Sequence, residues 1–189
     1  MSQAPDVTGT GGALRVYTIG HSTRSGADFV ALLRQYDMVS LADIRTMPRS
    51  RHNPQFNTEA LAGTLPSEGI AYVHLAALGG LRRGLGVESP NTGWRNAGFR
   101  AYADYMLTEP FRQGLEELLA IAARGPAAIM FAEAVPWRCH RSLVADALVI
   151  RGIRVRDILD QRHAPPHQLT PFARVVGDRI TYPPETPPA

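Results

Sequence analysis

Short apolar runs alternate with amphipathic segments along most of this chain. Runs rich in β-branched, aromatic and other apolar residues are typical of buried strands. The predicted strands are 15–19, 38–44, 70–75, 127–131 and 154–159. Between them, apolar residues recur every three or four positions, which is the spacing of one helix face. The predicted helices are 27–36, 58–68, 99–107, 110–123 and 142–150.

This alternation of strands and helices predicts an α/β fold. Parallel strands need long crossover connections, so we expect a single-domain, largely parallel five-stranded sheet with helices on both faces. We assign this domain to residues 14–160. Residues 1–13 are small and polar and predict a flexible leader. The Pro-rich residues 161–189 predict a C-terminal extension that wraps the surface or frays.

The composition indicates a soluble globular protein, with 44% hydrophobic and 20% charged residues. No apolar run approaches the ~20 residues that cross a bilayer, so no membrane partner is expected. The one cysteine, Cys139, cannot form an internal disulfide, which favours the cytoplasm. The oligomeric state is left open.

Arginine supplies all 20 basic residues, and the net charge is +3. A guanidinium is charged at any working pH and binds phosphate or carboxylate through two parallel hydrogen bonds. This composition is compatible with a nucleotide or nucleic-acid partner. It does not establish one, because the net charge is small and the arginines are spread along the chain.

The most unusual stretch, 132–141, lies between the fourth predicted strand and the next helix. It places Cys139 near a helix N-terminus, beside His140 and between Arg138 and Arg141. Such a setting stabilises a thiolate, and helix N-termini attract anions. Chemistry is therefore expected near this end of the sheet.

Polar side chains also follow the other strands of the predicted sheet. The carboxyl ends of parallel strands share one edge, where ligands bind in α/β folds. The side chains expected to catalyse are Cys139, Glu133, His21 and Asp43. Those expected to bind the ligand are Ser22, Arg45, Gly79, Gly80, Arg82, His140 and Arg141. Cys139 would be a nucleophile or a polar wall, Glu133 or His21 would move protons, and the arginines would hold anionic oxygens.

Each of these residues also has a purely structural interpretation. Cys139 could be a small buried hydrophobe. Arg45 and Arg141 could pair with Asp43 and Glu133 as structural salt bridges. His21 could serve only to hold its own loop in place.

Other features leave the ligand open. The Gly79–Gly80 pair could serve only to form a turn, or it could let backbone amides approach a phosphate. Trp94 with Phe99 could be a hydrophobic plug or a base-stacking platform. The sequence identifies no cofactor. Cys139, His21, His74 and Glu133 are acceptable zinc ligands, but their spacing matches no compact metal signature, so no metal site is predicted.

These motifs, in this order, resemble those of the DUF488 proteins, a prokaryotic family of uncharacterised function. The matching pieces are Tyr17–Ser22, Asp43–Arg45 with Pro48 and Ser50, Leu78–Gly80 with Arg82, Phe99 with Tyr102–Met106, and Glu133 with Cys139–Arg141. The resemblance implies a single α/β domain and supplies no reaction. The family often has a cysteine where this chain has Phe131, so a mechanism that needs two cysteines does not fit.

Three functions follow from these observations. The first is an enzyme that acts on a phosphate-bearing substrate, a nucleotide or nucleic acid, at the edge of the sheet. The second is a non-catalytic nucleic-acid-binding module that uses the same arginines. The third is rhodanese-like thiol chemistry at Cys139, although the glycine-rich loop expected around such a cysteine is missing. We favour the first, because carboxylates and a thiol stand among the arginines.

Overall fold

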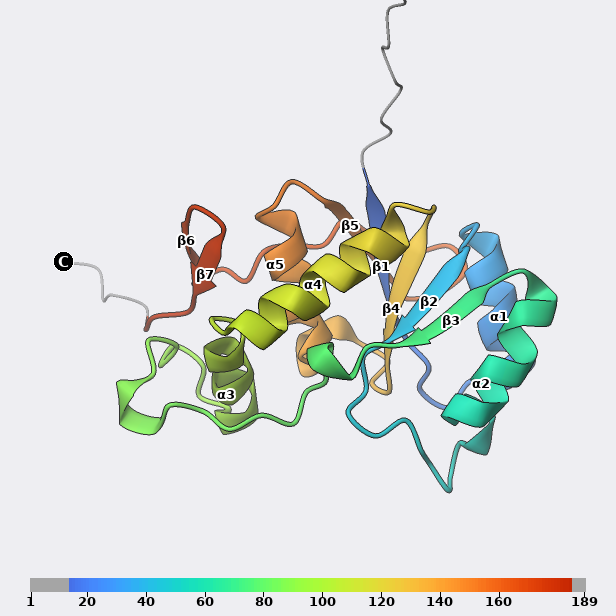
Figure 1. Cartoon of the computed structure of the whole chain (residues 1–189), viewed down its shortest axis with the longest axis horizontal. Helices are drawn as coiled ribbons and strands as arrows, with labels where there is room; N and C mark the ends of the chain where they lie inside the picture. The colour runs from blue at the N-terminus through green and yellow to red at the C-terminus, as the bar shows by residue number, and fades with distance from the viewer. Residues whose placement is uncertain (1–13, 185–189) are drawn as a thin grey trace, which may run out of the picture.

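A five-stranded sheet forms the centre of the protein. The computed structural model describes residues 14–184. Every neighbouring pair of strands is parallel, and the order is β3-β2-β4-β1-β5 (Figure 1). The strands are β1 (Arg15–Gly20), β2 (Ser40–Asp43), β3 (Ala71–His74), β4 (Ala127–Phe131) and β5 (Arg154–Ile158). The predicted α/β fold is confirmed.

Five α-helices connect these strands, close to the predicted segments. They are α1 (Gly26–Gln35), α2 (Thr58–Thr64), α3 (Ala97–Tyr105), α4 (Glu109–Ala122) and α5 (Arg141–Val149). The second is shorter than predicted, because Pro66 cannot donate an α-helical hydrogen bond and the chain continues as a 3₁₀ turn. Gly69 then ends this turn with a φ of 74°. In the described part of the chain, no helix is both long and apolar enough to cross a membrane.

The sheet has a core on each face, and alternate residues of each strand enter different cores. Along β1, Val16 packs into the core under α3, α4 and α5, whereas Tyr17 packs into the core under α1 and α2. In Figure 1 the first two helices lie together at one side of the sheet and the other three at the opposite side. The connections after β1 and β4, which are neighbours, therefore leave toward opposite faces. This arrangement opens a crevice at the carboxyl edge of the sheet.

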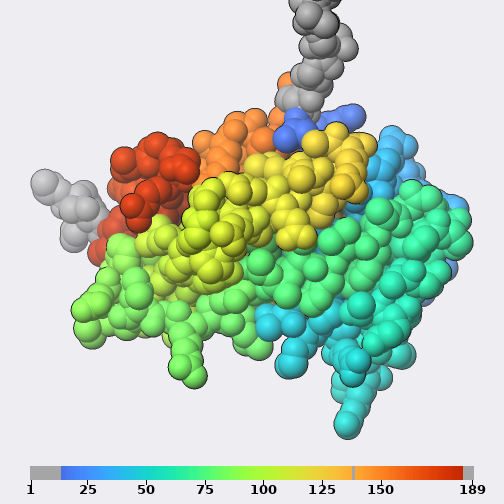
Figure 2. All heavy atoms as spheres, viewed as in Figure 1, coloured from blue at the N-terminus to red at the C-terminus, as the bar shows by residue number. Residues whose placement is uncertain are grey.

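The C-terminal extension packs against α5. It contains an antiparallel hairpin, β6 (Arg174–Val176) and β7 (Arg179–Thr181), which the sequence analysis did not predict. Ile180 and Tyr182 are buried in the same core as α5. Figure 2 shows the hairpin, in red, against the side of the molecule next to this helix, in orange. The predicted leader, 1–13, and the last residues, 185–189, lie outside the described residues.

Candidate functional site

A cavity of about 550 Å³ lies at the carboxyl edge of the sheet, where the sequence predicted a pocket. The segments that follow β1, β2, β3 and β4 all contribute to it, together with the start of α3. Six of the predicted site residues line the cavity: His21, Arg45, Gly80, Glu133, Cys139 and His140. We call this cavity the edge pocket.

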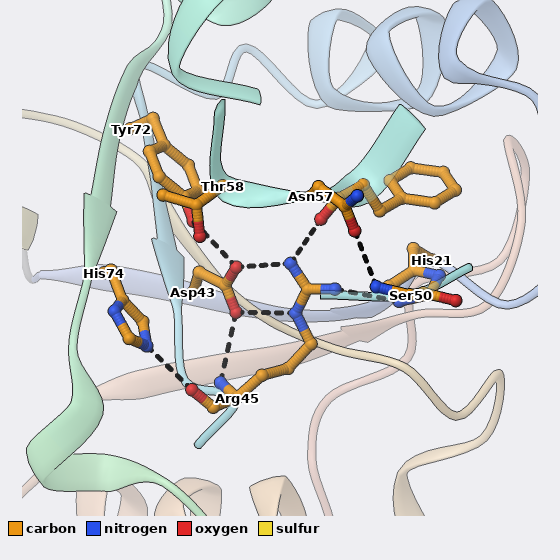
Figure 3. Close-up of polar contacts among 9 residues, drawn as sticks. His21, Asp43, Arg45, Ser50, Asn57, Thr58, Tyr72 and His74 are labelled. Atoms are coloured by element: carbon orange, nitrogen blue, oxygen red, sulfur yellow. Dashed lines mark hydrogen bonds and ion pairs between the residues drawn. The ribbon is translucent and has the colours of Figure 1, made fainter. Parts of the chain in front are cut away.

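Arg45 and Asp43 form a buried, two-pronged ion pair beside the edge pocket (Figure 3). The Arg45 Nε donates to Asp43 Oδ1 at 2.9 Å, and Nη2 donates to Oδ2 at 2.5 Å. The same carboxylate accepts the hydroxyl of Tyr72 at 2.9 Å. Arg45 also donates to the carbonyl of Phe56 at 2.6 Å. Asp43 is therefore occupied in orienting Arg45, which is the structural interpretation considered for it.

His21 presents an unprotonated nitrogen next to this pair. Its ring stacks on Phe56 with centroids 4.3 Å apart, and its Nδ1–H donates to the Ser22 carbonyl at 2.8 Å. This bond fixes the tautomer, so Nε2 accepts from Arg45 Nη1 at 3.4 Å. Burial lowers the pKa of His21, and the charge of Arg45 lowers it further. His21 is thus a neutral imidazole whose one lone pair, on Nε2, lies at the pocket and faces Arg45.

Ser22 holds the turn in which His21 lies. Its φ of 49° is in the left-handed region, which is unusual for a residue other than glycine. Its backbone N–H donates to the Ala132 carbonyl at 2.8 Å, which ties the segment after β1 to the segment after β4. The Ser22 side chain is not part of the pocket lining.

Cys139 is a buried thiol in the pocket wall. Its Sγ accepts the backbone N–H of Arg141 at 3.4 Å. Burial raises the pKa of Cys139 to about 12, and this outweighs the opposing attraction of Arg141. The sequence predicted a stabilised thiolate, but the structure favours the thiol, because the sulfur is enclosed and accepts only one backbone N–H.

His140 is also buried and neutral. Its Nε2–H donates to the Leu78 carbonyl at 3.1 Å, and its Nδ1 lies 4.0 Å from Cys139 Sγ. Burial lowers the pKa of His140 to about 4. Gly80 leaves room for this ring, since a Cβ there would lie 2.5 Å from Nδ1. The Gly79–Gly80 pair therefore permits close packing rather than a left-handed turn.

Arg141 fixes the segment between β4 and α5 from inside the protein. It is fully buried and donates to the carbonyls of Glu133 and Ala134, the latter at 2.9 Å. Gly20 makes this possible, because a Cβ at that position would lie 1.8 Å from the Glu133 carbonyl oxygen. Arg141 is not among the residues that line the edge pocket.

Arg82 has a similar internal role. It donates to the carbonyls of Ala76, Ala77 and Gly79 at 2.8–2.9 Å, and its guanidinium carbon lies 3.8 Å above the Tyr105 ring. Like Gly79, it is not part of the pocket lining. Among the three arginines predicted to hold anionic oxygens, Arg45 is the one that reaches the edge pocket.

A comparison with protein families gives this arrangement a context. Residues 25–148 match a family described as "Domain of unknown function DUF488". The chain belongs to the DUF488 family. The match includes Asp43, Arg45 and the segment from Glu133 to Arg141, and it begins after His21. Searches of curated proteins and of solved structures found no match.

The DUF488 edge pocket contains further residues that the predicted site did not include. Arg49 lines it with a largely exposed side chain, which pairs with Glu59 at 3.1 Å. Thr46, Asn53 and Asn96 also line it. Three of these four lie in the segment after β2. Their position after a strand that ends at this edge could have identified them as candidate pocket residues.

Two further expectations concern the wider site. Trp94 stacks on Phe99 with centroids 4.7 Å apart and also packs against Phe172 and Tyr182, as a hydrophobic plug does. Phe99 reaches the edge pocket as well. Within residues 14–184, the structure brings together no group of three or more His, Cys, Asp or Glu side chains that could hold a metal ion.

Proposed function

We propose that this DUF488 protein is an enzyme that acts on a phosphate-bearing substrate, a nucleotide or nucleic acid, in the edge pocket. The observation that carries this proposal is the position of His21. Its unprotonated Nε2 lies 3.4 Å from a guanidinium nitrogen of Arg45, and both residues line one cavity. A neutral imidazole beside a fixed cation suits proton transfer next to a bound anion.

Arg49 is the residue best placed to meet the phosphate. Its pair with Glu59 is exposed, and an exposed ion pair contributes little, so a ligand can replace Glu59 as the partner. A guanidinium can bind a phosphate through two hydrogen bonds. Arg45, by contrast, is held in place by Asp43 and offers the remaining Nη1 edge toward His21.

His21 would act as the general base. Its Nε2 would exchange the long contact with Arg45 Nη1 for a proton from a water molecule or a substrate hydroxyl, and the released Nη1 would then stabilise the negative charge that develops. The lowered pKa of His21 keeps the imidazole unprotonated at neutral pH. Glu133, which is exposed at the pocket mouth, would accept or return a proton on the other side of the substrate.

Cys139 contributes to the pocket wall in this proposal. Nucleophilic cysteines are thiolates, whereas burial raises the pKa of this thiol to about 12. The rhodanese-like alternative therefore has less physical support than proton transfer by His21.

A pair of variants separates binding from proton transfer. Arg49→Ala should weaken nucleotide binding roughly tenfold, the loss of one charged hydrogen-bonded contact. Arg112→Ala is the matched control, because Arg112 is also an arginine in exposed glutamate pairs but lies on α4, outside the pocket lining. Binding is measured by thermal shift and titration calorimetry with nucleoside mono-, di- and triphosphates and a short single-stranded oligonucleotide.

His21→Asn tests the catalytic role. The asparagine amide can retain the hydrogen bond to the Ser22 carbonyl, but it removes Nε2. It should bind the same nucleotides as the wild type and form at least a hundredfold less product, followed by mass spectrometry. The proposal fails if no nucleotide binds, if Arg112→Ala weakens binding as much as Arg49→Ala, or if His21→Asn retains full turnover.

A further inference from the structure

A second cavity, of about 480 Å³, lies beside the same β4–α5 segment. No residue lines both this cavity and the edge pocket. Glu133 and Cys139 face the edge pocket, whereas Pro136 and Trp137 face the second cavity. The two cavities are therefore separate sites on either side of one short segment.

Aromatic rings and prolines form most of the wall of this second cavity. Trp94, Trp137 and Phe172 line it, and the prolines are Pro136, Pro165, Pro166 and Pro171. The chain has two tryptophans, and both are here. Trp137 is 65% exposed, an unusually large apolar surface to leave in water. Such walls bind flat apolar groups and, through the faces of the rings, organic cations.

Three side chains beneath the wall form a buried charged network. His167 donates from Nδ1 to Asp157 Oδ2 at 2.8 Å and from Nε2 to Asp146 Oδ1 at 2.9 Å. Asp157 Oδ1 also accepts the hydroxyl of Thr18 at 2.6 Å. The two carboxylates raise the pKa of His167 to about 9 despite its burial, so the ring is an imidazolium at neutral pH. Two carboxylates thus face one imidazolium.

Most side-chain donors that line this cavity already have partners within the protein. Both nitrogens of His167 are occupied, the Ser142 hydroxyl donates to the Cys139 carbonyl at 3.0 Å, and the Thr170 hydroxyl donates to Asp146 at 2.7 Å. The indole N–H groups are the exception. Asp157, by contrast, retains acceptor capacity, because each carboxylate oxygen has two lone pairs and each accepts one bond from the protein.

Arg141 is the other buried cation that acts on Asp157. Its terminal nitrogens donate to the carbonyls of Glu133 and Ala134. Its charge therefore offsets the one excess negative charge of the network, but its terminal nitrogens do not bond to Asp157 and leave the free lone pairs of that carboxylate to a ligand. The cavity offers an acceptor surrounded by aromatic faces.

We propose that the second cavity binds a small primary amine with an aromatic body. The amine would donate to Asp157, and the ring would pack against Trp94, Trp137 and Phe172. A ligand with the same aromatic ring but a carboxylate in place of the amine would be repelled by the negatively charged oxygens of Asp157. This site is independent of the phosphate-binding function proposed for the edge pocket.

The test compares 2-phenylethylamine with phenylacetate, two probes that share a ring and differ in the charged group. The full chain is titrated with each, and the two indole N–H resonances are followed by ¹⁵N-labelled NMR together with tryptophan fluorescence. The amine should shift both resonances and bind roughly tenfold more tightly than phenylacetate. Equal or tighter binding of phenylacetate, or indole resonances that do not move with the amine, would overturn the proposal.

Trp137→Ala supplies the second measurement, by calorimetry. Because Trp137 is largely exposed, its removal should leave the fold intact and weaken the amine several-fold. Val87→Ala is the matched control, since Val87 is a fully exposed apolar residue outside the cavity. An unchanged affinity of Trp137→Ala for 2-phenylethylamine, or an equal loss of affinity in Val87→Ala, would also contradict the proposal.

Discussion

Asp43 grips Arg45 through two parallel hydrogen bonds, and both side chains are almost completely buried. The pair lies where β2 ends, so the carboxylate of Asp43, the last residue of the strand, orients the guanidinium of Arg45 in the loop that follows. The carbonyl of Phe56 and the hydroxyl of Tyr72 complete the arrangement. A buried pair of this kind orients a group more than it stabilises the fold. Its value lies in presenting Arg45 Nη1 to His21.

Asp43→Asn should be strongly destabilising. The amide cannot neutralise the buried guanidinium, and removing one partner of a buried pair lowers the free energy of unfolding by about 3–5 kcal/mol. Urea denaturation measures this change. Glu59→Gln is the matched control, because it removes the exposed partner of Arg49 and should change the free energy of unfolding by less than about 1 kcal/mol. Similar losses in the two variants would contradict the distinction.

The stability of the protein should fall as the pH rises above neutral. Asp146 and Asp157 raise the pKa of His167 in the folded state to about 9, against 6.5 for an ordinary histidine. A raised pKa means that this stabilisation is fully present below about pH 6.5 and is lost as the pH rises through about 9. The total loss is roughly 3 kcal/mol, measured as the free energy of unfolding between pH 6 and 10.

His167→Gln is the control for this pH dependence. Glutamine can retain a hydrogen bond to one carboxylate but does not titrate. Its free energy of unfolding should be lower than that of the wild type at pH 6 and change less between pH 6 and 10. If the free energy of unfolding of this variant changed with pH as steeply as that of the wild type, another titrating group would be responsible for the effect.

Gly80→Ala should disturb the edge pocket, because a Cβ would lie 2.5 Å from His140 Nδ1. That ring cannot easily move, since it is buried and bound to the Leu78 carbonyl. We expect a loss of about 1–3 kcal/mol in the free energy of unfolding. Gly63→Ala in α2 is the control: nothing lies within 4 Å of its Cβ, and alanine there should stabilise the helix by about 0.5–1 kcal/mol.

The periodic part of the fold could be predicted because each element carries its own signal. Strand β4 follows from the apolar run 127–131, and α1 follows from its spaced apolar residues. The structure adds the Ser25 cap of α1, whose hydroxyl accepts the N–H of Asp28 at 3.0 Å. The hairpin β6–β7 could not be predicted in this way. Its strands have three residues each, and β7, which pairs with β6, is held by contacts with α5, about thirty residues earlier in the chain.

The candidate site was predictable in position but less so in detail. The parallel sheet brings His21, Arg45 and Glu133 to one edge, as the order of strands and loops indicated. Arg141 points toward carbonyls of the loop that precedes it, and the conformation of that loop has no periodic signal, so the internal role of Arg141 could not be predicted from the sequence. The burial of Cys139 likewise depends on neighbours from other segments.

The Cys139 thiol should be nearly unreactive in the folded protein, despite its basic neighbours. Its pKa of about 12 lowers the thiolate fraction at pH 8 roughly a thousandfold relative to an ordinary cysteine, and burial also blocks access. Labelling with iodoacetamide, followed by intact mass, should be at least a hundredfold faster in denaturant than in native buffer. The chain has one cysteine, so the signal is unambiguous. Rapid labelling in native buffer would instead indicate a thiolate at Cys139 and would favour its nucleophilic role.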